Sequence, residues 1–260
     1  MTPPVLGVIP ARLGSTRLPR KPLHPIAGRP LLEWVWRAAR DAGIFDAVVI
    51  ATDSPDVEEA ARRFGARAVL TRDDHPSGTD RVAEVARREE WRGYPVIVNV
   101  QGDEPFVRAG HLQAAVDLVR TGWEVGTVAA PIASAAEWRE PAVVKVVRGD
   151  DGRALCFTRA PLPHPRDAEP DFASGAYLRH VGIYAYARDA LLRWVSLPEG
   201  VLERIEKLEQ LRALAAGLRI GVAVGEPAEG GVDTPADALR AERLILDRTV
   251  PTPELERATP

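Results

Sequence analysis

VLGVIPARLGSTRLPRKPL, at residues 5–23, is the most informative part of the chain, because an apolar run predicted to be a strand leads here directly into a basic loop. The run at 5–10 predicts a buried strand, and the loop after it holds four cations and no acid. The four cations are Arg12, Arg17, Arg20 and Lys21. Proteins with a parallel sheet bind ligands where the strands end at their carboxyl side. Uncompensated cations at such an end predict a polyanionic ligand, such as a triphosphate, with a solvated basic loop as the alternative.

This loop offers backbone groups to phosphate without matching a common phosphate-binding motif. Gly14, Ser15 and Thr16 can present amide N–H groups to phosphate oxygens, as an anion-binding nest does. The GxxxxGK[ST] spacing of a Walker loop and the GxGxxG turn of dinucleotide-binding proteins are both absent. The sequence therefore argues against a P-loop NTPase and against a dehydrogenase.

Short apolar runs and helical segments alternate after this loop. Strands are predicted at 47–52, 66–71 and from 95 to a loop at Gly102, and helices at 30–43, 54–65 and 80–91. Alternation of this kind is typical of βαβ units. The strands are apolar on both faces, which requires helices on both sides of the sheet. We predict an α/β, three-layer, Rossmann-like fold with a mainly parallel sheet.

The pattern changes after residue 125. Strand signals at 126–132, 142–159 and 179–187 surround a hairpin turn at 150–152, and a Pro/Gly-rich stretch follows at 160–177. A helix at 201–217, a strand at 218–224 and a helix at 234–248 complete the chain. We predict a single domain over 1–250, with a tail at 251–260. Its nucleotide-binding core comprises 1–125 and 220–250, and a smaller mixed β/α subdomain at 126–219 serves for sugar binding and dimerisation.

Composition excludes several classes of protein. The 260 residues carry a formal net charge of -3, which supplies no field that would attract nucleic acid or an anionic membrane. No apolar run approaches the roughly 20 residues of a membrane span, and MTPPVLGVIP has no signal for cleavage, so a cytoplasmic protein is expected. The single cysteine, Cys156, allows no internal disulfide or thiolate metal cage. Only three of the 34 basic residues are lysine, and the last of these, Lys207, is interpreted as part of a solvated helix face.

Two acids follow predicted strands far apart in the chain. Asp103 stands in NVQGDEP and Asp233 in GVDTPAD, so both carboxylates can meet at one edge of the sheet. Mg²⁺ prefers oxygen ligands and commonly takes one or two carboxylates together with substrate phosphates. The pair predicts a magnesium site. For Asp233 the alternative is a helix N-cap before Thr234 and Pro235.

Nine motifs in order resemble one enzyme family. They are VIPARLGSTRLPRKPL, ATDSPDVEEAARRFG, TRDDHPSGTDRVAE, VIVNVQGDEP, AVVKVV, FTRAPLP, LRHVGIYAY, LEQLRAL and GVDTPAD, and they cover about residues 5–245. Together they look like the cytidylyltransferases that activate 3-deoxy-manno-octulosonate, the CMP-KDO synthetases. The resemblance implies a fold of the nucleotide-diphospho-sugar transferase type, Mg²⁺ as cofactor, and CTP and an eight-carbon 2-keto acid sugar as substrates. It also implies a homodimer, paired through about 130–220, that serves lipopolysaccharide biosynthesis.

The resemblance also assigns residues. For the nucleotide it implies Ala11, Arg12, Ser15, Arg17, Lys21, Arg72, Ser77, Gly78 and Asp103, of which Arg72, Ser77 and Gly78 surround the cytosine. For the sugar it implies Gln101, Arg159, His180, Tyr184, Glu209 and Gln210, with Arg159 or His180 directed at the carboxylate. The catalytic set is Arg12, Lys21, Asp103 and Asp233, and the last two of these bind the metal. Two alternatives remain: a cytidylyltransferase for another acidic 2-keto sugar of sialic type, and a non-catalytic nucleotide-binding protein.

Overall fold

A computed structural model describes residues 2–249, and the predicted tail at 251–260 lies outside the described residues. The strands are β1 (Val5–Ala11), β2 (Pro25–Ile26), β3 (Arg29–Pro30), β4 (Ala47–Thr52), β5 (Arg67–Leu70), β6 (Val96–Asn99), β7 (Val125–Pro131), β8 (Lys145–Arg148), β9 (Ala154–Thr158), β10 (Leu178–Ala187) and β11 (Ile220–Val224). The helices are α1 (Leu31–Asp41), α2 (Pro55–Arg63), α3 (Gly78–Arg87), α4 (Ala109–Arg120), α5 (Ala135–Arg139), α6 (Arg188–Ser196), α7 (Val201–Glu206), α8 (Gln210–Ala215) and α9 (Pro235–Thr249). Short 3₁₀ turns are η1 (Lys21–Leu23), η2 (Glu89–Trp91) and η3 (Phe172–Ser174).

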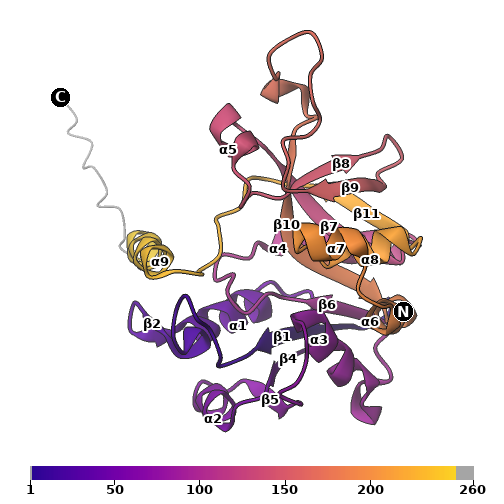
Figure 1. Cartoon of the computed structure of the whole chain (residues 1–260). Coiled ribbons are helices and arrows are strands. Elements are labelled where there is room, and N and C mark those ends of the chain that lie inside the picture. Colours follow the sequence, from indigo (N-terminus) through magenta and orange to yellow (C-terminus); the bar gives the residue numbers. More distant parts are fainter. Residues whose placement is uncertain (1, 250–260) are drawn as a thin grey trace, which may run out of the picture.

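One nine-stranded sheet organises the molecule (Figure 1). Its main path runs β11-β7-β10-β6-β1-β4-β5, and β8 and β9 extend from β10. The strands β6, β1, β4 and β5 are parallel neighbours, whereas β10 runs antiparallel to β6, β7 and β8. The predicted parallel core with a mixed second part is therefore confirmed.

Helices cover both faces of the sheet. Apolar side chains of α1, α2, α4 and α9 pack on one face, and those of α3, α6 and α8 pack on the other. Strands buried on both faces need such coverage, which explains their continuous apolar runs. The three-layer prediction is confirmed. None of the helices within residues 2–249 combines the length and the apolar composition that a bilayer span requires.

The predicted helix at 201–217 is wrong as a single element. The chain forms α7 and then α8, and between them Lys207 adopts a left-handed backbone conformation with φ 53° and ψ 47°. This conformation ends α7, because its dihedral angles lie far from those of a right-handed helix. The break turns the chain so that residues 207–210 line a cavity, as described below.

Candidate active site

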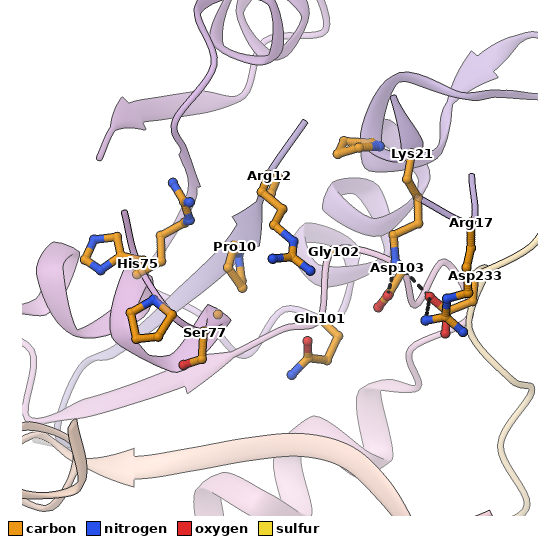
Figure 2. Close-up of a pocket in the computed structure, with 15 residues that line it drawn as sticks. Pro10, Arg12, Arg17, Lys21, His75, Ser77, Gln101, Gly102, Asp103 and Asp233 are labelled. Carbon is orange, nitrogen blue, oxygen red and sulfur yellow. Dashed lines mark hydrogen bonds and ion pairs between the residues drawn. The ribbon is translucent and has the colours of Figure 1, made fainter. Parts of the chain in front are cut away.

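Most of the predicted nucleotide-binding residues line one cavity at the carboxyl ends of β1 and β6 (Figure 2). In the sheet β1 lies between β4 and β6. The chain continues from β1 through α1 to β4 on one side, and from β6 through α4 to β7 on the other side, so the two connections diverge at this point. Such a point is where α/β sheets bind ligands. The cavity has a volume of about 350 Å³. Of the predicted residues it is lined by Ala11, Arg12, Arg17, Lys21, Ser77, Gly78, Gln101, Asp103 and Asp233.

Gly102 allows the loop after β6 to approach the end of β1. A Cβ atom at this position would lie 2.5 Å from the carbonyl oxygen of Pro10, which no side chain could tolerate without a shift of the backbone. Glycine is therefore required at this close approach. The approach places Asp103, the next residue, beside Lys21 from the loop after β1.

Lys21 joins the two remote acids. Its Nζ lies 2.5 Å from Oδ2 of Asp103 and 3.0 Å from Oδ1 of Asp233, and Arg17 also contacts this Asp233 oxygen at 3.1 Å. Burial disfavours the charged ammonium, but the two carboxylates outweigh burial and raise the pKa of Lys21 above its ordinary value. The predicted convergence of Asp103 and Asp233 is confirmed.

Asp233 is free for this role because other residues cap the helix after it. The Thr234 hydroxyl accepts a hydrogen bond from the Asp237 amide at 3.2 Å, and Asp237 Oδ2 accepts from the Thr234 amide at 3.0 Å. This reciprocal pair satisfies the first turn of α9 in the manner of a capping box. The alternative that the Asp233 side chain serves as the N-cap is wrong.

Two further titratable side chains near Asp103 and Asp233, those of Arg12 and Glu104, differ in their surroundings. Within residues 2–249 Arg12 makes no ion pair, and its guanidinium points toward the open cavity (Figure 2). Burial, and then the neighbouring Asp103, raise the pKa of Glu104 to about 8, so this carboxyl is protonated at neutral pH. Among the described residues the cavity therefore offers two acids that share Lys21 and one cation, Arg12, without an ion pair.

Two predicted nucleotide-binding residues lie outside the cavity lining. The Ser15 hydroxyl accepts a hydrogen bond from the Leu18 amide at 3.4 Å, which stabilises the loop itself. Arg72 is exposed and pairs with Asp74 at 3.3 Å. The structure thus gives Ser15 and Arg72 local roles, and their contact with nucleotide stays a prediction.

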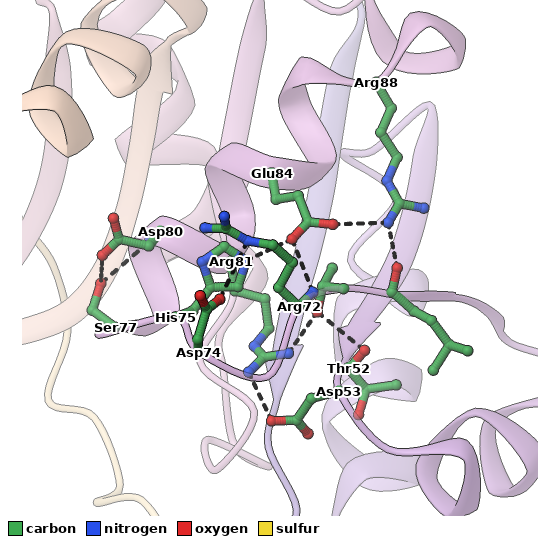
Figure 3. A network of polar contacts seen from close by, with 12 residues as sticks. Thr52, Asp53, Arg72, Asp74, His75, Ser77, Asp80, Arg81, Glu84 and Arg88 are labelled. Atoms are coloured by element: carbon green, nitrogen blue, oxygen red, sulfur yellow. Dashed lines mark hydrogen bonds and ion pairs between the residues drawn. The ribbon is translucent and has the colours of Figure 1, made fainter.

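His75 and Arg81 line the cavity although the sequence analysis assigned neither to it, and both belong to a network of polar contacts around α3 (Figure 3). His75 Nε2 lies 2.6 Å from Oε2 of Glu84, and the buried Arg81 guanidinium donates to Oδ2 of Asp53 at 2.9 Å. Hydrogen bonds from the Arg72 amide, His75 and Arg88 overcome the effect of burial and lower the pKa of Glu84. These contacts join α3 to the loop before it and to Asp53 after β4. The sequence could have assigned Arg81 to the cavity, because Arg81 follows Ser77 by four residues and therefore lies on the same face of α3.

A second cavity, of about 290 Å³, adjoins the first and shares Gln101 with it. Five of the six predicted sugar-binding residues line it: Gln101, His180, Tyr184, Glu209 and Gln210. Thr79, Trp194 and Lys207 also line it, and Lys207 is exposed, as its interpretation as a solvated residue predicts. Residues 160–177 contribute to neither cavity.

Glu209 lines the second cavity and binds one residue from the lining of each cavity. Its carboxylate accepts hydrogen bonds from Ser77 Oγ and Thr79 Oγ1, each at 3.0 Å. Burial is the largest influence on this side chain and raises the pKa of Glu209 above its ordinary value. A carboxylate that accepts hydrogen bonds from two hydroxyl groups can exchange these partners for hydroxyl groups of a ligand.

The two residues predicted to face a sugar carboxylate are poorly suited to do so. The Arg159 guanidinium donates to the backbone carbonyl groups of Glu206 at 2.7 Å and Pro141 at 3.0 Å, and Arg159 is not part of the cavity lining. Burial lowers the pKa of His180 to about 3, so the ring is neutral, and its Nε2 lies 3.0 Å from Thr127 Oγ1. His180 can donate one hydrogen bond but supplies no positive charge.

His180 should make folding stability depend on pH. The folded protein leaves the ring unprotonated down to about pH 3, whereas the unfolded chain protonates it near the ordinary value of 6.5. Between these values the unfolded chain binds more protons, so this contribution to stability is complete above pH 6.5 and is lost as the pH falls. From pH 7 to pH 5 the loss should reach up to about 2 kcal/mol in the free energy of unfolding. Urea denaturation at both pH values should show a smaller loss for His180→Asn, and an equal loss in both proteins would contradict the assignment.

Fold and site together define a nucleotidyltransferase: a parallel α/β core with cations and paired acids at its ligand-binding edge. The chain belongs to the cytidylyltransferase family, whose sequence profile matches residues 6–220. It is 53% identical over 240 residues to the 3-deoxy-manno-octulosonate cytidylyltransferase of Gemmatimonas aurantiaca, covering 92% of this chain and 93% of that protein. It is 47% identical over 245 residues to the protein of the same name from Acidobacterium capsulatum, covering 94% and 97%.

Solved structures agree with this assignment. A CMP:2-keto-3-deoxy-manno-octonic acid synthetase complexed with CTP superposes with a TM-score of 0.88 at 42% identity, covering 94% of this chain and 99% of that chain. A 4-diphosphocytidyl-2C-methyl-D-erythritol synthase from Anaerococcus prevotii superposes with a TM-score of 0.63 at 12% identity and shares the fold alone.

Proposed function

We propose that this enzyme transfers CMP from CTP to 3-deoxy-D-manno-octulosonate and releases pyrophosphate. The observation that carries the proposal is the convergence of Asp103 and Asp233 on Lys21, beside the unpaired Arg12, in a cavity that adjoins a second one. The first cavity has the charges that a triphosphate requires, and the second has the hydrogen-bonding groups that a sugar requires. Relatives that carry this activity in their names support the choice of substrates.

In the proposed reaction the anomeric 2-hydroxyl of the sugar attacks the α-phosphorus of CTP in line. The new bond joins the sugar oxygen to the α-phosphorus, the bond from the α-phosphorus to the bridging oxygen of the β-phosphate breaks, and the hydroxyl proton passes to solvent water. Arg12, Arg17 and Lys21 would hold the triphosphate and offset the charge that develops on the departing pyrophosphate. Gln101, which lines both cavities, would keep the sugar next to the nucleotide.

The reaction needs no covalent enzyme intermediate. The one cysteine, Cys156, lies in β9 and lines neither cavity. Burial raises the pKa of its thiol, which disfavours the nucleophilic thiolate. Direct transfer with charge neutralisation is therefore the mechanism that these side chains support.

The carboxylate oxygens of Asp103 and Asp233 suit Mg²⁺ as ligands. Within residues 2–249 no three His, Cys, Asp or Glu side chains form a group that could hold a metal ion by themselves. Asp103 and Asp233 nevertheless share one cation, and two carboxylates with substrate phosphates are a common magnesium environment. When bound, Mg²⁺ would neutralise phosphate charge and favour ionisation of the attacking hydroxyl. Because Lys21 contacts both carboxylates, it competes with a metal ion for them.

A pyrophosphate-release assay with purified protein, Mg²⁺ and CTP tests the proposed activity. A panel of 2-keto acid sugars should give the highest kcat/KM for the eight-carbon acid. A preference for a nine-carbon sialic-type acid would reassign the substrate. Binding of CTP without pyrophosphate release from any sugar would favour the non-catalytic alternative.

We also propose a homodimer, in a cytoplasmic enzyme that supplies lipopolysaccharide biosynthesis. Support for pairing comes from α7, where Val201, Leu202 and Ile205 are 66%, 58% and 72% exposed within the predicted dimerisation region. A second copy that covers this face would remove apolar surface from water. Wild type should sediment as a dimer, and the double variant Leu202→Asp, Ile205→Asp should sediment as a monomer. Equal sedimentation of the two proteins would place the interface elsewhere.

A further inference from the structure

Strand β10 is irregular where it borders the second cavity. Its pairing with β7 shifts in register between Val181 and Tyr184, and Tyr184 lies opposite Thr127. Such a bulge leaves backbone groups outside the regular ladder and is common next to active sites. In this bulge the carbonyl groups of Val181 and Ile183 both lie near the Thr127 hydroxyl.

The Thr127 hydroxyl has one proton to donate. Its Oγ1 lies 2.7 Å from the carbonyl oxygen of Ile183 and 3.0 Å from Nε2 of His180, and Thr127 is fully buried. A carbonyl oxygen only accepts hydrogen bonds, so a contact of 2.7 Å between these two oxygens requires the hydroxyl proton between them. The hydroxyl can then only accept from His180, and Nε2 of His180 therefore carries a proton.

The other ring nitrogen of His180, Nδ1, is left with a lone pair. Burial lowers the pKa of His180 to about 3, so the ring is neutral at pH 7 and carries a single N–H group. The rings of Phe157 and Tyr184 pack against it with centroids 5.1 and 5.2 Å away, and Nδ1 has no hydrogen-bond partner among residues 2–249. Because His180 lines the second cavity, the position that it keeps for a ligand is an acceptor.

An acceptor at this position recognises a hydroxyl group and not an acid. A carboxylate has no proton to donate at neutral pH, so its contact with the Nδ1 lone pair would be repulsive. In the proposed acceptor sugar the carboxylate is attached to the carbon that bears the reacting 2-hydroxyl, so it belongs beside the first cavity. Carbons farther along the sugar bear hydroxyl groups, and these would reach the second cavity. Glu209 in the same wall is another acceptor for them.

Two buried donors share this wall. The Tyr184 hydroxyl and the Trp194 indole N–H make no hydrogen bond within the described part of the chain, and both residues line the second cavity. Buried donors in native proteins are nearly always satisfied, so these two indicate a ligand with oxygen acceptors. A sugar hydroxyl both donates and accepts, and it therefore suits a wall that combines acceptors with unpaired donors.

We propose that Thr127 fixes His180 as the Nε2–H tautomer, so that Nδ1 accepts a hydrogen bond from a hydroxyl group of the acceptor sugar. Thr127 is thus a positioning residue, which lines neither cavity and acts on the substrate through His180. The tautomer follows from the fold alone, whereas its effect on the sugar rests on the proposed function.

Nitrogen-15 NMR of the histidine side chains measures the tautomer, since protonated and unprotonated ring nitrogens resonate at different frequencies. The chain has five histidines, and comparison with His180→Asn assigns the signals of His180. At pH 7 wild type should show a protonated Nε2 and an unprotonated Nδ1. Thr127→Val removes the acceptor and should move the proton to Nδ1, because an N–H group that faces a methyl group would be unsatisfied. Thr127→Ser keeps the hydroxyl and should give the wild-type signals.

Pyrophosphate release measures the effect on the sugar. Thr127→Val should raise the KM for the eight-carbon acid by about tenfold, as expected for one lost hydrogen bond, and should leave the KM for CTP unchanged. Thr127→Ser should match wild type. The matched control is Thr52→Val, because Thr52 is also a fully buried threonine of the sheet but accepts from the Ser54 amide. This control should keep the His180 signals and the KM for the sugar.

The wild-type spectrum decides the tautomer even if Thr127→Val folds poorly. A protonated Nδ1 in wild type, or an unchanged tautomer in folded Thr127→Val, would overturn the inference. So would a wild-type KM for the sugar in Thr127→Val after the proton has moved, since the ring would then not accept from the sugar. If wild type releases no pyrophosphate with any sugar, the proposed function fails, and the spectra still decide the role of Thr127.

Discussion

Replacement of Asp103 by Asn should lower turnover by about a hundredfold or more, and Asp233→Asn should have an effect of similar size. The two carboxylates come from loops after β6 and before α9, and they meet on one ammonium group at 2.5 and 3.0 Å. Each substitution keeps the shape of the side chain but removes half of the negative charge available to a metal ion. A loss of this size is typical when a main electrostatic stabiliser of a phosphoryl transition state is removed.

The measurement is kcat at saturating CTP and sugar across a magnesium titration. Asp56→Asn is the matched control, because Asp56 is an exposed acid that pairs with Arg20 at 2.8 Å near the same loop. The control should retain wild-type turnover at every magnesium concentration. Near-normal turnover of Asp103→Asn or Asp233→Asn at limiting magnesium would show that the replaced carboxylate does not bind the metal ion.

Replacement of Lys21 by Ala should weaken CTP binding and slow transfer, with a combined loss in kcat/KM for CTP of about a hundredfold. The side chain is the link between the two acids, and its raised pKa keeps it charged throughout the neutral range. Without it, two neighbouring carboxylates face the triphosphate with less compensation, and their mutual repulsion disorders the pocket.

A second measurement separates the role of Lys21 from general damage to the pocket. Because Lys21 competes with a metal ion for both carboxylates, Lys21→Ala should bind Mn²⁺ more tightly than wild type in the absence of CTP. Arg20→Ala is the control, since the neighbouring Arg20 pairs with Asp56 at 57% exposure and does not line the cavity. Unchanged CTP kinetics in Lys21→Ala would show that this loop is merely solvated.

The position and charge of the first cavity were predictable because they depend on local sequence. An apolar run predicts a strand, and parallel strands end at a common edge, so the cations after β1 and the acids of NVQGDEP and GVDTPAD had to lie near one another. The break at Lys207 was not predictable in the same way. The pattern at 201–217 is that of a continuous helix, and helical propensity is a weak determinant that tertiary packing overrides.

The α/β class, the ligand-binding edge of the sheet and the resemblance to the cytidylyltransferases were predictable from the amino-acid sequence, because hydrophobic periodicity and the order of motifs can be recognised without knowledge of contacts. Which side chains remain available to a ligand depends instead on how the chain packs. Packing gave the Arg159 guanidinium backbone carbonyl partners, made His180 neutral by burial, capped α9 with Thr234 and placed Lys207 beside the second cavity. Charge and hydrogen bonding at a site depend on burial and on partners distant in the chain, and these quantities exist only once the chain has packed.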